Sequence, residues 1–146
     1  MRFRHILAPL ILTVASAGAV AAYAAGTATV HTRHAKLGTY VVDAKGMTLY
    51  LFEKDKTKKS SCYGACAKVW APLTVMGKPT TGSGLKASLL STTTRTGGAK
   101  QVTYGGHPLY HYDDDHKAGQ MKGQGSTEFG AKWYVVAPSG KKIDPS

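Results

Sequence analysis

The sequence predicts an all-β fold: a small single domain built from two pseudo-repeated antiparallel hairpin units with little helix. Three observations support this fold class. The segment Tyr40–Asp55 recurs 60 residues later, without a gap, as Lys100–Asp115. Both copies consist of β-branched and aromatic runs on either side of a glycine-containing turn. A tryptophan follows each copy, at Trp70 and Trp133, as expected for supersecondary units that bury their apolar faces against each other.

Residues 1–24 are predicted to be a signal peptide. A positively charged start precedes the apolar stretch Ile6–Val20, and small residues fit cleavage after Ala24, with a nearly equivalent site after Ala21. The stretch is shorter than the ~20 residues that span a bilayer, which disfavours an uncleaved anchor. No cysteine follows it, which excludes lipid attachment there. We therefore expect a periplasmic or secreted protein with no stable membrane anchor after cleavage.

The mature chain is expected to form a flexible leader and one β domain. The leader lacks hydrophobic periodicity, and the segment between the two copies is rich in Gly, Thr and Ser. The predicted boundaries are the leader at 25–37 and the single β domain at 38–146, divided into repeat one at 38–73, a linker loop at 74–97 and repeat two at 98–141.

Each repeat is predicted to open with a hairpin. In the first copy, strands at Thr39–Val42 and Met47–Glu53 flank a turn that contains Gly46. In the second, strands at Gln101–Tyr104 and His107–Asp113 flank Gly105 and Gly106. Glycine at these turns is explained by a backbone position that needs φ > 0.

The return segments contain the remaining elements. Cys62–Val69 is predicted to form one or two helical turns that end before Pro72, and Lys132–Ala137 is predicted to form the last strand. Asp55 and Asp115 close the repeated strands, where a carboxylate can accept backbone N–H bonds in an Asx turn.

Alternation along the repeated strand predicts which side chains form the core. Residues of one parity share a face, and Leu49 and Leu51 lie opposite the aromatic positions of the first copy. Both faces of that strand are apolar, so it is expected to be central in its sheet. The repeated aromatics are interpreted as core and not as a cofactor-stacking platform. The predicted core and motif positions are Tyr50, Phe52, Tyr110, Tyr112, Trp70 and Trp133.

Cys62 and Cys66 are expected to form one disulfide. An exported chain meets an oxidising compartment, and two cysteines are an even count. The spacing is C-x-x-x-C, whereas dithiol oxidoreductases have C-x-x-C, and no His follows Cys66 as haem attachment requires. Two cysteines alone do not make a closed zinc site.

The charge of the mature chain is strongly basic. After removal of the signal peptide, 17 Lys and Arg face 8 Asp and Glu, for a net charge of +9. An exported protein rarely meets nucleic acid, so the partners expected are anionic envelope polymers or acidic proteins. The lysines that cluster are Lys54, Lys56, Lys58 and Lys59, which we interpret as a solvated loop beside the disulfide and as a candidate anion-binding site.

The second copy contains the cluster most similar to a metal site. His111 and Asp113 share a strand face at roughly 7 Å, and His116 can join them if the chain turns after the strand. Imidazole and carboxylate ligands suit zinc, copper or nickel. A weak transition-metal site, or a haem site with Tyr110 or Met121 as an axial donor, is therefore the alternative to a solvated acidic turn.

The doubled strand also carries a family motif. Tyr50–Asp55 (YLFEKD) and Tyr110–Asp115 (YHYDDD) both fit Tyr-x-(Phe/Trp/Tyr)-x-x-Asp. The chain resembles a family of bacterial secreted-repeat proteins and predicted lipoproteins with this motif, over residues 38–140. The resemblance implies an exported envelope protein with the two cysteines paired, and it implies no chemistry, because the family's function is unknown. The chain differs in lacking a lipobox Cys and in Ala71, where the family usually has Pro.

Taken without the resemblance, the residues favour a non-enzymatic protein. No nucleophile can be assigned a paired His and carboxylate, and the glycine-rich segment at 119–130 lacks the phosphate-loop pattern. We expect an exported cell-envelope protein, a binding or structural module without a cofactor. The alternative is a periplasmic metal- or haem-binding protein that uses the cluster described above.

Overall fold

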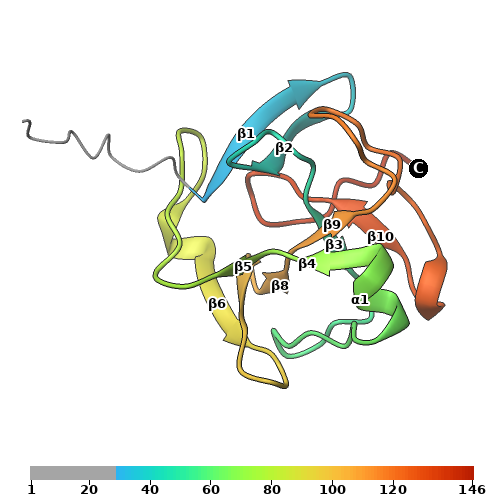
Figure 1. The fold of residues 1–146 in the computed structure, drawn as a ribbon. Coiled ribbons are helices and arrows are strands. Elements are labelled where there is room, and N and C mark those ends of the chain that lie inside the picture. The colour runs from blue at the N-terminus through green and yellow to red at the C-terminus, as the bar shows by residue number, and fades with distance from the viewer. Residues whose placement is uncertain (1–28) are drawn as a thin grey trace, which may run out of the picture.

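Antiparallel β-sheets make up most of the regular secondary structure of the computed structural model, which describes residues 29–146 (Figure 1). The predicted signal peptide at 1–24 and residues 25–28 lie outside the described residues. The all-β prediction is confirmed, since the only regular α-helix in this range is one short segment. The elements are β1 (Val30–Ala35), β2 (Gly38–Asp43), β3 (Tyr50–Phe52), α1 (Ala65–Val69), β4 (Trp70–Pro72), β5 (Thr74–Val75), β6 (Leu90–Thr94), β7 (Lys100–Tyr104), β8 (His107–Pro108), β9 (Tyr110–Tyr112) and β10 (Trp133–Val135), with 3₁₀ turns at Ala87–Leu89 and Glu128–Gly130.

The central sheet interlocks the two repeats. Its strand order is β10-β3-β9-β4, and β3 and β9 pair antiparallel with Tyr50 opposite Tyr110. β10, from repeat two, pairs with β3 of repeat one, whereas β4, from repeat one, pairs with β9 of repeat two. Each return segment therefore completes the sheet beside the other repeat's strand.

The two hairpin turns differ by one residue. In the first, Leu49 N–H donates to Val41 C=O at 3.2 Å, and in the second Leu109 N–H donates to Val102 C=O at 3.0 Å. Val102 is thus the structural counterpart of Val41, and the gapless correspondence with Val42 is wrong on this side of the turn. The cause is turn length: Gly105 and Gly106, with φ of 60° and 80°, close a two-residue turn, whereas the first turn has three residues.

The prediction of a flexible leader at 25–37 is wrong for the part of this range that the structure describes. β1 pairs antiparallel with β2 over six residue pairs, from Val30 opposite Asp43 to Ala35 opposite Gly38. Val30 is fully buried, and a parallel bridge joins it to Thr81. The segment has little periodicity because only its first residue is buried, and its strand is held by pairing with β2 and by the bridge to Thr81.

The predicted linker loop at 74–97 is also wrong in part. β5 and β6 fall inside it and pair with the two edges of β7, giving the order β5-β7-β6. Ser and Thr fill β6, and threonine is β-branched and suits a strand although it also occurs in loops. Helical turns were expected in Cys62–Val69, and α1 occupies the second half of that segment.

Two apolar clusters lie on opposite faces of the central strands. Tyr50 and Phe52 belong to one cluster, with both tryptophans, and Leu49 and Leu51 belong to the other. The alternation predicted for the repeated strand is confirmed, and β3 is central in its sheet. One face therefore carries a mainly aromatic core, and the other carries a mainly aliphatic core that also contains Tyr104 and Tyr134.

Candidate functional site

The motif tyrosines and aspartates bond across the two repeats. Tyr50 donates its hydroxyl hydrogen to Asp115 Oδ2 at 2.6 Å, and Tyr110 donates to Asp55 Oδ2 at 2.6 Å. Charge-assisted bonds of this length are among the stronger protein hydrogen bonds. Each motif thus supplies a donor to the other motif and accepts a bond in return.

The predicted Asx turns of the two aspartates are replaced by longer connections. Asp55 Oδ1 accepts the N–H of Ser61 at 2.7 Å, and Asp115 Oδ1 accepts the N–H of Lys122 at 2.9 Å. An Asx turn would use the N–H two residues on. Each carboxylate instead joins the segment that follows its own strand to the tyrosine of the other repeat.

A column of four stacked rings lies between the repeats. Phe52 stacks on Trp133 at 3.9 Å between ring centroids, and Trp133 stacks on Trp70 at 3.9 Å. Trp70 stacks in turn on Tyr112 at 4.3 Å. Tyr50 and Tyr110 meet this column edge-on, against Trp70 and Trp133 respectively. The aromatics are therefore core, as predicted, and within the column each motif ring stacks on the tryptophan from the other repeat.

Both motif tyrosines stay protonated at neutral pH. Burial raises the pKa of Tyr50 well above its usual 10.0, and the hydrogen bond to Asp115 adds to the effect. Burial also raises the pKa of Tyr110, followed by the charge of Asp55. A tyrosine held neutral beside a carboxylate is a hydrogen-bond donor and not a nucleophile. The geometry of these pairs supports a role in joining the repeats.

The loop at 54–61 is fastened at its C-terminal end. Ser60 Oγ lies 2.7 Å from the Tyr110 hydroxyl and accepts a hydrogen bond from Arg95 Nη1 at 2.9 Å. Cys62 and Cys66 form the predicted disulfide, with Cα atoms 5.3 Å apart. These contacts hold the lysine-rich part of the chain against the core.

Arg95 is the buried charge behind this loop. Its guanidinium donates to Cys62 C=O at 2.7 Å and to Gln101 Oε1 at 2.7 Å, and it stacks over Tyr63 at 4.3 Å. Only 8% of Arg95 is exposed, and Gln101 is fully buried. Neutral acceptors therefore satisfy this cation, with no carboxylate among its hydrogen-bond partners in residues 29–146.

The four clustered lysines are exposed, as predicted for a solvated loop. Lys54, Lys56, Lys58 and Lys59 all lie on the surface beside the disulfide. Thr57 and Lys58 adopt φ of 56° and 65°, an unusual left-handed pair, and Lys59 N–H closes the turn on Lys56 C=O at 3.1 Å. The turn presents its ammonium groups outward from a segment that is anchored at its end.

A surface depression of about 660 Å³ lies next to this loop. Burial lowers the pKa of His107, one of its lining residues, so the imidazole is more often neutral than a free histidine. The polar and charged groups around the depression include both signs. Its lining residues are Leu51, Phe52, Glu53, Asp55, Lys56, His107, Ala131, Lys141 and Lys142.

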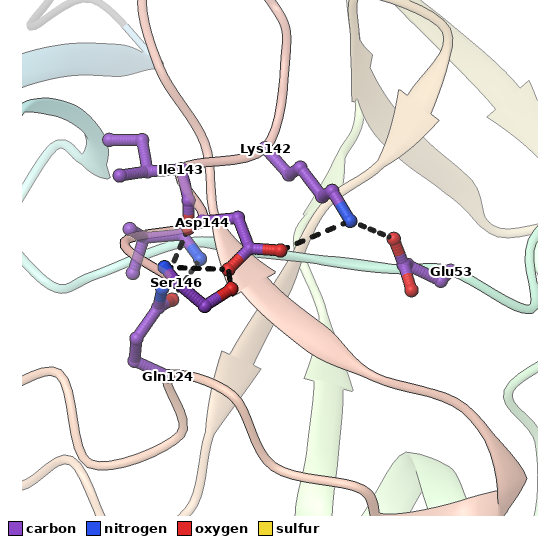
Figure 2. Close-up of polar contacts among 7 residues, drawn as sticks. Glu53, Gln124, Lys142, Ile143, Asp144 and Ser146 are labelled. Atoms are coloured by element: carbon purple, nitrogen blue, oxygen red, sulfur yellow. Dashed lines mark hydrogen bonds and ion pairs between the residues drawn. The ribbon is translucent and has the colours of Figure 1, made fainter.

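Lys142 is the one lysine with carboxylate partners in the described chain. Figure 2 shows its Nζ between Glu53, at 2.7 Å, and Asp144, at 3.4 Å. The hydrogen bond to Glu53 raises the pKa of Lys142, and bonds from Ser146 lower the pKa of Asp144 to about 2. Gln124 in the same view donates to Ile143 C=O at 2.7 Å, which holds the C-terminal segment against the domain.

Most of the acidic side chains form hydrogen bonds or ion pairs with other side chains of the fold. Six of the eight carboxylates accept bonds from side chains: Asp43 from His111, Asp55 from Tyr110, Asp115 from Tyr50, Glu128 from Trp70, and Glu53 and Asp144 from Lys142. No other Lys or Arg within residues 29–146 forms an ion pair. Apart from the buried Arg95, the excess positive charge therefore comes from side chains without a carboxylate partner.

The predicted metal ligands do not come together. His111 Nε2 lies 2.8 Å from Asp43 Oδ2, at the end of β2 in repeat one. No group of three or more His, Cys, Asp or Glu side chains suited to a metal ion occurs in the described part of the chain. Met121 packs against the aromatic cluster, and the Tyr110 hydroxyl is bonded to Asp55. The proposed ligands and axial donors therefore have structural partners or lie apart.

Comparison with protein families identifies the repeat. Residues 31–74 and 91–137 each match the family described as a secreted repeat of unknown function. The chain belongs to this family. The two matches coincide with the two interlocked units, and the family indicates an exported protein. No helix in residues 29–146 has the length and hydropathy of a membrane span, and no curated protein or solved structure matches the chain.

Sequence reasoning missed several residues of the secreted repeat. Arg95 lies in the segment interpreted as a linker, and Gln101 lies at a strand position that alternation alone marks only as inward or outward. Gly123 was seen only as part of a glycine-rich stretch. A Cβ at Gly123 would lie 2.6 Å from the Trp70 ring, and its N–H donates to the Tyr50 hydroxyl at 3.2 Å. Its context in the sequence gives no sign of this close approach.

Proposed function

We propose that this secreted repeat is a non-enzymatic cell-envelope protein that binds anionic envelope polymers through its lysine-rich surface. The observation that carries the proposal is the distribution of charge. Six of the eight carboxylates accept bonds from side chains, whereas 16 of the 17 Lys and Arg in the described chain have no carboxylate partner. A field of unpaired cations attracts polyanions and raises their rate of encounter.

The loop at 54–59 is the proposed centre of this surface. Its four lysines are exposed, and Lys56 lines the nearby depression together with Lys141. Because the loop is anchored through Ser60 and the disulfide, less of its conformational freedom remains to be lost on binding. The motif tyrosines and aspartates are used in bonds between the repeats, and no nucleophile in the sequence can be assigned a paired His and carboxylate, so a binding role is favoured over catalysis.

Titration of the exported, purified protein with alginate, an anionic polysaccharide, tests this function. We expect affinity to fall steeply as salt is raised from low to physiological ionic strength, because screening weakens exposed charge contacts. Changing Lys54, Lys56, Lys58 and Lys59 together to Glu should reduce affinity by at least about tenfold, which corresponds to about 1.4 kcal/mol.

A charge-matched variant separates this site from the total charge. Lys68, Lys86, Lys117 and Lys132 are also exposed and lie in other segments, so changing all four to Glu alters the net charge equally. The control should weaken binding less than the loop variant. Equal losses would show that only the net charge matters, and salt-independent binding would contradict an electrostatic mechanism.

A further inference from the structure

β6 is an edge strand with unpaired backbone groups. It pairs with β7 only, and it lies on the outside of the fold, at the left of Figure 1. Gly105 N–H bonds to Leu89 C=O and Arg95 N–H bonds to Ala99 C=O, so the odd-numbered residues between them face β7. The backbone groups of Thr92 and Thr94 therefore project from the free edge.

A groove runs beside this edge. It has a volume of about 680 Å³, with the segment 76–81 as one wall and Leu90, Ser91 and Thr92 as the other. In the first wall, Val30 bonds to Thr80 C=O and Gly82 N–H, and by alternation the N–H and C=O of Thr81 face away from β1. No backbone bond to Thr81 occurs within residues 29–146. Both walls thus carry backbone donors and acceptors without partners.

The edge lacks the usual protection against strand addition. Natural edge strands often carry Lys, Pro or a bulge, and β6 has the sequence LSTTT with a regular five-residue register. Five strand residues extend over roughly 17 Å, enough for the main-chain bonds of a short peptide. The rim also includes Met76, a fully exposed apolar side chain of a kind enriched at protein interfaces.

The charges around the groove favour an acidic partner. Lys78 and Lys100 line it, and no Asp or Glu is among its lining residues. Neither lysine forms an ion pair in the described chain. A second copy of this protein is a poor occupant, because each copy carries a net charge of +9 after signal removal.

We propose that β6 takes up an extended acidic segment of a partner protein as an added β-strand, in the groove between β6 and residues 76–81. Main-chain bonds to Thr92 supply affinity, and Lys78 and Lys100 select carboxylate side chains. This site goes beyond the polymer-binding surface, because it uses none of the four loop lysines.

Amide exchange with a defined peptide tests the proposal. The probe is an acetylated heptapeptide of alternating Glu and Val, with a Lys and Val peptide as its control. In the exported protein, the acidic peptide should slow exchange at the Thr92 and Thr94 amides at least about tenfold, because these amides gain partners. The lysine peptide should leave both rates unchanged.

Two pairs of variants separate the backbone from the charges. Thr92→Pro removes the outward N–H and is tolerated at an edge, whereas Thr92→Val keeps it. Proline should lower peptide affinity at least about tenfold, and valine should not. Lys78→Glu with Lys100→Glu should weaken binding more than Lys68→Glu with Lys86→Glu, which changes the charge equally.

Three outcomes would overturn the proposal: unchanged Thr92 and Thr94 exchange at millimolar acidic peptide, equal binding of the lysine peptide, or a protein dimer formed through β6. The variant with four Glu in the 54–59 loop distinguishes the two proposals. It should lose alginate binding and keep peptide binding.

Discussion

The two repeats share one strand and its contacts with the other repeat, and they differ in the elements farther from that strand. Leu49–Phe52 and Leu109–Tyr112 match at the 60-residue offset in sequence and in structure, because β3 and β9 pair with each other about Tyr50 and Tyr110. Before the turn the offset changes by one residue, and the preceding strands have different neighbours: β2 pairs with β1, whereas β7 lies between β5 and β6.

This difference shows which contacts constrain the repeat. The motif positions that bond or stack on the other repeat have counterparts there: tyrosine with aspartate, and aromatic ring with tryptophan. Other positions vary, including one that also joins the two repeats. Leu51 is buried, whereas its counterpart His111 bonds to Asp43 of repeat one. The motif therefore describes an interface between the two halves of the domain.

The largest effect is expected from truncating the ring column. Trp133→Ala and Trp70→Ala should each lower the free energy of unfolding by about 3–5 kcal/mol, since both rings are fully buried and stacked on two neighbours. The double variant should cost less than the sum, because the two rings contact each other. Chemical denaturation measures all three, and strict additivity would argue against one shared column.

The second largest effect is expected from high pH, which should weaken the contacts of Tyr50 and Tyr110 between the repeats. The pKa values of Tyr50 and Tyr110 are raised above the 10.0 of the unfolded chain, so the folded state keeps its protons where the unfolded state loses them. The contribution is complete below pH 10 and is lost as pH rises above it, at about 1.4 kcal/mol per pH unit for each tyrosine. Denaturation at pH 9 to 11 should show a shallower fall for Tyr50→Phe with Tyr110→Phe, and equal slopes would contradict these pKa shifts.

A smaller loss of stability is expected from a substitution at Gly123 in repeat two. An added Cβ would lie 2.6 Å from Trp70 and 3.1 Å from Tyr112, so Gly123→Ala should destabilise the protein by about 1–3 kcal/mol. Gly77→Ala is the matched control, because no atom lies within 4 Å of its added Cβ. Thermal denaturation of both variants checks this, and equal midpoints would show that repeat two does not pack tightly here.

Local patterns predicted the parts of the fold that repeat. The alternation at Leu49–Phe52 predicted the central strand and its two apolar faces. The disulfide between Cys62 and Cys66 was predicted because an exported chain meets an oxidising compartment. The sequence did not indicate which distant segments pair with each other as strands. β1 has one buried residue, and β6 consists mainly of Ser and Thr, so neither has a strong pattern of its own.

From the sequence, only the composition of the candidate site could be predicted, and not the contacts that hold it. The lysine loop follows from its sequence, but the anchoring of Ser60 by Arg95 spans 35 residues, and no spacing rule connects them. The arrangement around His111 could not be predicted for a related reason: strand spacing relates His111 to neighbours on its own strand, whereas its partner Asp43 is 68 residues away in the other repeat.

A pair of double-mutant cycles tests the interlocked arrangement most directly. One cycle combines Tyr50→Phe with Asp115→Asn, across the repeats, and the other combines Tyr50→Phe with Asp55→Asn, within one motif. Unfolding free energies should give a coupling of about 1–3 kcal/mol across the repeats and close to zero within the motif, since only the first pair is hydrogen-bonded. A larger coupling within the motif than across the repeats would contradict the account.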